Sequence, residues 1–245
     1  MKSFFPIIFC FLVATSCQNE PDVETILQKS IDAHGGNSVY NSHISFNFRN
    51  NQYDAIYNKG NYTLTRTFVD SLNTKIKDVL TNTNFERTVN DTLVTVTDAW
   101  KIKYSNSINS VIYFFRLPFN LKDPATKLTL LGTSKIETKE YYKVKVFFSE
   151  EGGGEDFSDQ FVYWFNTKTY TLDYFAYEYS TSGGGKRFRK AINQRKINGL
   201  LVSDYINYEP KNLDIEIEHY DTYFEEDGLK KLSEIVNKNV RVTYY

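Results

Sequence analysis

Along most of this chain, apolar residues recur at every second position, the period that turns successive β-strand side chains to opposite faces. In 42–49, for example, Ile44, Phe46 and Phe48 alternate with polar residues. The pattern predicts strands at 42–49, 52–57, 62–69, 84–89, 92–97, 127–131, 141–148, 160–165, 170–179, 186–197, 200–208 and 213–219, with a terminal strand or tail at 240–245. Asn198-Gly199 and similar short turns join neighbouring strands as hairpins, which indicates a mainly antiparallel sheet.

Three segments follow the helical period instead. They are 23–34, 98–115 and 229–236. Asp22 can cap the first helix and Asp98 the second. The second helix carries an apolar stripe at steps of three and four residues, which predicts that it packs against the sheet. The stripe consists of Trp100, Tyr104, Ile108, Val111 and Phe115.

The chain contains no linker long enough to separate two domains. We therefore expect one β-rich domain at 22–245, of the α+β class, preceded by a short tether at 17–21. Both cysteines of the chain, Cys10 and Cys17, precede this domain, so the domain itself contains no thiol. Its stability therefore has to come from the burial of apolar side chains, and the chain has 19 Phe and 19 Tyr for this purpose.

Residues 1–16 have the features of an export signal. Lys2 precedes an apolar run, and small residues precede Cys17. The run is too short to cross a bilayer as a helix, which needs about 20 apolar residues. The segment resembles a bacterial lipoprotein signal, although Ala14 stands where such signals usually have Leu. The resemblance implies cleavage before Cys17, lipidation of Cys17 and a lipid-anchored protein of the cell envelope. The expected location is the outer membrane, with the domain facing either the periplasm or the cell surface.

The charge balance excludes one class of partner. The chain has 29 Lys and Arg against 30 Asp and Glu, without a strongly basic face that would suit nucleic acid. The expected partners are the membrane, reached through the lipid anchor, and a lipid or acylated ligand.

Three parts of the sequence resemble the lipoprotein-carrier superfamily, which is similar to the carrier and receptor of outer-membrane lipoprotein sorting. They are the opening helix with Gly35-Gly36, the strand-turn-strand sequence 163–174 and the strand pair at 198–208. The whole mature chain also resembles a lipoprotein family of Bacteroidetes. The resemblance implies a strongly curved, unclosed barrel whose concave side is plugged by helices and holds acyl chains.

No arrangement of residues predicts catalysis, a metal site or a cofactor. His34, His43 and His219 lack the spacing of a zinc site, and no G-x-S-x-G nucleophile motif occurs. The acidic loop 150–159 has glycines and carboxylates that would suit Ca²⁺, but a solvated loop is the better interpretation. We therefore expect no enzymatic activity.

The basic segment 186–190 could bind a phosphate headgroup, although a charged solvent-facing strand is favoured. The functional hypothesis is non-covalent binding of a hydrophobic or amphipathic molecule beneath the helix at 98–115. The alternative is a fully packed module that recognises a protein or a glycan through its loops. The expected ligand-binding residues are Trp100, Tyr104, Ile108, Phe46, Phe48, Tyr142 and Val144.

Overall fold

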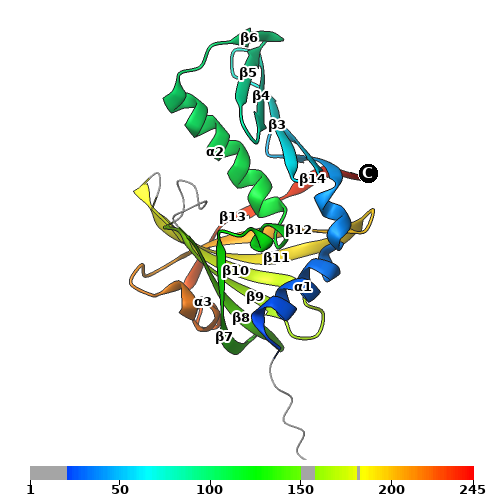
Figure 1. Ribbon diagram of the computed structural model, residues 1–245. Coiled ribbons are helices and arrows are strands. Elements are labelled where there is room, and N and C mark those ends of the chain that lie inside the picture. Colours follow the sequence, from blue (N-terminus) through cyan, green and yellow to red (C-terminus); the bar gives the residue numbers. More distant parts are fainter. Residues whose placement is uncertain (1–20, 150–157, 181–182) are drawn as a thin grey trace, which may run out of the picture.

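The computed structural model describes residues 21–149, 158–180 and 183–245 (Figure 1). The helical elements are α1 (Val23–His34), η1 (Asn37–Tyr40), α2 (Asp98–Phe115), η2 (Phe119–Lys122), η4 (Ile217–His219) and α3 (Tyr220–Glu225). The strands are β1 (Ser42–Phe48), β2 (Asn51–Asn58), β3 (Asn61–Val69), β4 (Lys75–Thr81), β5 (Phe85–Val89), β6 (Thr92–Val94), β7 (Thr126–Ile136), β8 (Lys139–Phe148), β9 (Gln160–Asn166), β10 (Leu172–Tyr179), β11 (Gly185–Ile197), β12 (Leu200–Pro210), β13 (Leu229–Ile235) and β14 (Asn237–Tyr244).

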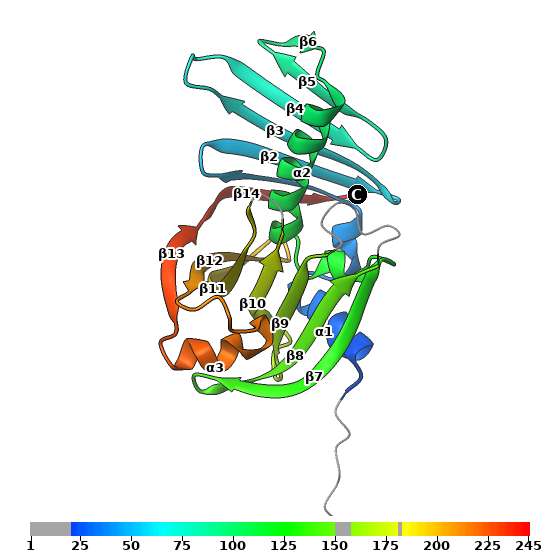
Figure 2. The ribbon, with the colours of Figure 1, turned by 90° about the vertical axis from the view of Figure 1, so that its left-hand side faces the viewer.

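These strands form two antiparallel sheets of seven strands each. Sheet A has the order β14-β1-β2-β3-β4-β5-β6, and sheet B has the order β13-β12-β11-β10-β9-β8-β7. Only Val236 separates β13 from β14, so the chain passes directly from the edge of one sheet to the edge of the other (Figure 2). The described strands therefore follow one curved wall that does not close into a barrel. The predicted α+β fold with an unclosed, curved sheet is confirmed.

Helix α2 lies across sheet A, with its contacts concentrated on β3, β4 and β5 (Figure 2). Arg66 on β3 donates from Nη1 to Oγ of Ser107 at 2.8 Å, which ties the helix to the sheet. Strand β4 was not among the predicted strands, although it pairs with β3 from Thr63 opposite Thr81 to Val69 opposite Lys75.

The central strands of sheet B are buried on both faces. In β9, Phe161, Tyr163 and Phe165 join the core that faces α1 and α2, while Val162 and Trp164 join a second core on the opposite face. The second core is covered by η4 and α3, in which Tyr220 is fully buried. Double-sided burial explains why β9 is an almost continuous apolar run rather than an alternating one.

The first helix agrees closely with its prediction. Oδ1 of Asp22 accepts a hydrogen bond from the backbone N–H of Thr25 at 2.7 Å, so Asp22 caps α1 as expected. Helix α2 spans the predicted residues, but its N-cap is Thr97 and Asp98 is already inside the first turn. The cap prediction at Asp98 was wrong by one residue.

Two predicted elements near the end of the chain were wrong in kind. The alternating segment 213–219 was predicted as a strand, but the structure has a turn there that leads into η4 and α3. The segment 229–236 was predicted as a helix, but it is β13, which pairs with β12 from Tyr205 opposite Ile235 to Pro210 opposite Leu229.

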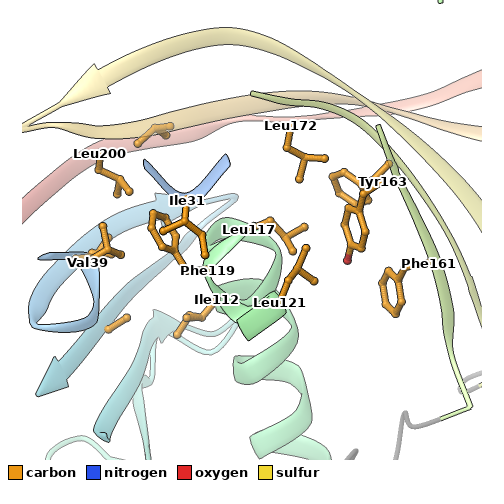
Figure 3. Packing of buried hydrophobic residues seen from close by; sticks show 14 of the residues in the cluster. Ile31, Val39, Ile112, Leu117, Phe119, Leu121, Phe161, Tyr163, Leu172 and Leu200 are labelled. Atoms are coloured by element: carbon orange, nitrogen blue, oxygen red, sulfur yellow. The ribbon is translucent and has the colours of Figure 1, made fainter. Parts of the chain in front are cut away.

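The main core lies where the two sheets and the two longer helices meet. Figure 3 shows Ile31 of α1, Ile112 of α2 and Leu172 of β10 converging in this space. Within the described residues, no helix is long and apolar enough to cross a membrane.

Candidate functional site

A cavity of about 660 Å³ lies between the last turns of α2, the β2–β3 hairpin and strands β8 to β10. Its volume falls within the range of about 300–1,000 Å³ that is usual for small-molecule sites. Among the described residues, ten with aromatic rings line it: Tyr40, Tyr57, Tyr62, Tyr113, Phe114, Phe119, Phe148, Phe161, Tyr177 and Tyr179. The curved sheet and the helix across it therefore leave a hollow in which half of the described lining residues are aromatic.

Polar side chains border the same cavity on the side of α2 and η2. They are Asn106, Asn109, Ser110, Arg116, Asn120, Lys122 and Asp123. Asp159, which immediately precedes β9, borders the cavity on the side of sheet B. Oδ1 of Asp123 accepts a hydrogen bond from the backbone N–H of Ala125 at 2.9 Å, and Nζ of Lys122 donates to Oε1 of Gln28 at 2.5 Å. The cavity thus combines an aromatic interior with a small number of placed polar groups, as ligand sites usually do.

Arg116 occupies an unusual position in this wall. It is the C-cap residue of α2, only 6% of it is exposed, and its guanidinium lies 3.5 Å from the centroid of the Tyr57 ring. Nη1 donates to Oδ1 of Asn120 at 3.1 Å, whereas Nε and Nη2 are buried without a hydrogen-bond partner. Among the described residues, no carboxylate forms an ion pair with this arginine.

Two buried tyrosines of the cavity, Tyr57 and Tyr113, are neutral at physiological pH because their pKa values are raised. Burial raises the pKa of Tyr57, although the positive charge of Arg116 lowers it in part. Burial also raises the pKa of Tyr113 to about 12. Their hydroxyls therefore contribute hydrogen-bonding groups rather than charge, and the cationic Arg116 is not neutralised by a phenolate.

A second, smaller cavity of about 220 Å³ lies on the other side of the same helix turns. Ser110 and Phe114 line both cavities. The Phe114 ring stacks on Phe175 with centroids 5.7 Å apart, and the guanidinium of Arg189 lies 4.2 Å from the Phe114 centroid. Phe114 therefore separates the two cavities.

The structure separates the seven residues that were expected to bind a ligand. Phe48 lines the smaller cavity, and the other six line neither. Ile108, Val144 and Phe46 are buried core residues, and Phe46 stacks on Phe115 with centroids 4.0 Å apart. Ligand contact by the seven residues stays a prediction.

The remaining three residues lie at the periphery. Trp100 is 51% exposed and stacks on Tyr104, with ring centroids 5.2 Å apart, towards the β6 end of α2. Tyr142 is half-buried and stacks on Tyr170, with centroids 5.9 Å apart. Sequence reasoning missed Tyr113, Phe114 and Arg116 because it followed one stripe of α2, although the dense run of aromatic residues before Arg116 was a usable signal.

The structure also places the other groups that were considered for chemistry. Among the described residues, no three His, Cys, Asp or Glu side chains are grouped as metal ligands. In the acidic loop, residues 150–157 lie outside the described part of the chain, as does Cys17.

The basic segment 186–190 does not form a charged solvent face, which corrects that interpretation. Phe188 is fully buried and Lys186 is 8% exposed, with Nζ donating to the backbone oxygen of Ile215 at 3.1 Å. Arg189 points to the other side of the strand and borders the smaller cavity. Sheet B buries this strand on both faces because α3 covers its outer side.

Comparison with known proteins assigns the chain to a family. Residues 1–237 match a family of unknown function, DUF6503. The chain belongs to DUF6503. No curated protein matches this DUF6503 chain.

Solved structures show the fold class of this DUF6503 protein. A LolA superfamily protein from Nitrosomonas europaea is similar with a TM-score of 0.52 and 11% identity, over 89% of this chain and 92% of that one. A DUF1329 family protein from Desulfovibrio piger is similar with a TM-score of 0.53 and 10% identity, also over 89% and 92%. The predicted lipoprotein-carrier type of fold is therefore confirmed, at the level of the fold.

Proposed function

We propose that this protein binds a hydrophobic or amphipathic molecule, such as a lipid or an acylated compound, non-covalently in the 660 Å³ cavity beside the end of α2. The observation that carries the proposal is the ten-ring lining of a space large enough for a small molecule. The similarity of fold to a LolA superfamily protein supports it. In the same proposal, the protein works in the cell envelope, attached to a membrane through a lipid on Cys17.

The aromatic lining would bind an apolar chain chiefly by removing its surface from water. The gain is about 25 cal/mol per Å² of apolar surface buried. The polar groups along α2 and η2 border only one side of the cavity, so an amphipathic molecule can place its polar end there and its chain against the rings.

Native mass spectrometry of the protein purified from its own envelope tests the proposal directly. We expect a bound molecule that is released by organic solvent and whose mass is compatible with the cavity. A preparation that carries no bound molecule and takes up no fluorescent fatty-acid probe after delipidation would contradict the proposal.

A pair of variants on α2 assigns the binding to this cavity. Ser110 is exposed and lines both cavities, so Ser110→Trp adds bulk where a ligand would lie. Ile102 is 46% exposed on the same helix and lines neither cavity, so Ile102→Trp is the matched control. We expect the first variant to lower probe binding and the second to leave it unchanged, with both melting like the wild type.

A further inference from the structure

Within the described residues, the guanidinium of Arg116 is a buried cation without a paired anion. A buried charge is stable only when it is paired or fully hydrogen-bonded, because transfer from water into the protein interior is costly. Two other largely buried guanidinium groups of the described chain are paired with a carboxylate, because Arg66 and Arg87 both bind the fully buried Asp78. Arg189 differs from them: its Nη2 donates to the hydroxyl of Tyr177 at 2.8 Å, and its Nε is buried without a partner.

Fewer interactions offset the burial of the positive charge of Arg116. Its partners are one amide oxygen, on Asn120, and the face of the Tyr57 ring. A cation over an aromatic face is attracted by the electrons of the ring, but the ring carries no negative charge that would neutralise it. Nε and Nη2, which form the edge that binds carboxylates and phosphates in a bidentate manner, are left without an acceptor.

The two acidic side chains on the cavity wall do not supply that acceptor. Asp123 accepts from the backbone N–H of Ala125, and Asp159 accepts from the backbone N–H of Ser180 at 3.3 Å. Neither forms an ion pair with Arg116. Within the described residues this acceptor is missing, and a molecule that enters the cavity can supply it.

We infer that Arg116 binds the anionic group of an amphipathic ligand, a carboxylate or a phosphate, while the ligand's apolar chain lies against the aromatic rings. This inference rests on the proposed function and specifies its ligand class. In this proposal the long side chain turns about its terminal bonds, so that the free edge of the guanidinium faces the cavity that Arg116 borders. Tyr57 keeps the planar group in place from the opposite side.

Calorimetric titration of the delipidated protein with four probes tests the inference. The probes are dodecanoate, dodecyl phosphate, dodecanol and inorganic phosphate, each below its micellar concentration where one exists. We expect the two anionic amphiphiles to bind about tenfold or more tightly than dodecanol, the difference that one hydrogen bond to a charged group gives. Inorganic phosphate should bind much more weakly than dodecyl phosphate, which distinguishes an amphiphile site from a site for the free anion.

Three variants complete the test. Arg116→Met should bind dodecanoate about tenfold or more weakly while binding dodecanol as the wild type does, and Arg116→Lys should lie between them because it keeps the charge and loses the planar fork. Arg241→Gln, an exposed arginine that borders neither cavity, is the control for net charge and should change nothing. Thermal melting adds a readout that is independent of binding. Arg116→Met should melt no lower than the wild type, because the arginine that it replaces lacks a buried anion.

The possible results distinguish the role of Arg116 from the proposed function of the cavity. Equal binding of dodecanol and dodecanoate, unchanged in Arg116→Met, would overturn the role of Arg116 and leave the proposed function standing. Binding of none of the probes would overturn both. A large fall in melting temperature for Arg116→Met, with unaltered discrimination between dodecanoate and dodecanol, would show that the arginine is structural.

Discussion

Asp78, which is completely buried, accepts a hydrogen bond from Nε of Arg87 with a donor–acceptor distance of 2.6 Å. The same carboxylate accepts from Nη2 of Arg66 at 2.7 Å. Arg87 in turn lies 3.4 Å from the centroid of the Tyr104 ring, and Arg66 donates to Ser107. One carboxylate therefore neutralises the two cations through which sheet A contacts α2.

Removal of that carboxylate should weaken the fold strongly. Asp78→Asn leaves two largely buried guanidinium groups without a counter-ion, and breaking a buried pair in this way costs about 3–5 kcal/mol. Urea denaturation measures the change in the free energy of unfolding. Asp91→Asn is the control, because the Lys75–Asp91 pair is exposed and such pairs contribute about 0–1 kcal/mol. Equal effects of the two substitutions would refute this account of Asp78.

The apolar stripe of α2 should divide into a core part and a surface part. Ile108 is fully buried, and Ile108→Ala should lower the free energy of unfolding by about 2–5 kcal/mol. Trp100 is half-exposed and makes one stacking contact with Tyr104, so Trp100→Ala should cost about 0.5–1.5 kcal/mol. Chemical denaturation of both variants measures the contrast. A larger loss for Trp100→Ala than for Ile108→Ala would be inconsistent with the packing of this helix.

The stability of the protein should depend on His34 below neutral pH. Burial lowers the pKa of His34 from 6.5 to about 4. Its Nδ1 lies 2.7 Å from the backbone oxygen of Ser30, and the backbone N–H of Leu172 donates to Nε2 at 3.5 Å, so the neutral ring joins α1 to β10. Between these two pKa values the unfolded chain binds a proton that the folded chain does not, and acid therefore destabilises the fold.

The effect of His34 can be isolated by comparison with a variant that does not titrate there. The contribution of neutral His34 is fully present above pH 6.5 and is lost as the pH falls towards 4, in total roughly 3 kcal/mol. His34→Gln should be less stable than the wild type at pH 7, and the difference should shrink towards pH 4. Urea denaturation at several pH values measures both curves, and parallel curves would show that His34 is not buried in its neutral form.

Local patterns in the sequence were sufficient for much of the fold. The Asp22 cap with the apolar face of 23–34 located α1, and Asn198-Gly199 located the β11–β12 hairpin, where both residues have positive φ. These features depend on neighbours in the chain. The alternation in 42–49 and 141–148 was likewise correct, because each of these strands has one face in the main core.

The errors arose where long-range contacts overrode the local pattern. Leu229 and Leu232 are three residues apart, which favours a helix, yet the unpaired backbone edge of β12 takes up this segment as a strand. Ile215 and Ile217 alternate with acids like a strand, but Ile217 is instead buried against the outer face of sheet B. No pattern within either segment reveals these partners.

The candidate site was the least predictable part. A cavity is the space that packed elements fail to fill, so it depends on the relative placement of α2, the β2–β3 hairpin and sheet B rather than on any one of them. The sequence showed that α2 carries aromatic residues. It did not show that the gap lies beside Tyr113 and Arg116 instead of beneath the Trp100 end of the helix.

Attachment to a membrane through Cys17 makes a prediction that is independent of the cavity. Small residues precede Cys17, and Cys10 is the only other cysteine of the chain and lies within the signal-like segment. Buried acyl chains contribute about 0.8 kcal/mol per CH₂, so a single chain holds a protein only reversibly and two or more hold it stably. Cys17→Ser should thus move the protein from the membrane pellet to the soluble fraction after detergent-free lysis. Ser16→Ala, which keeps a small residue before the cysteine, is the matched control and should stay in the pellet. If Cys17→Ser also stays in the pellet, the attachment to the membrane does not depend on a lipid at this residue.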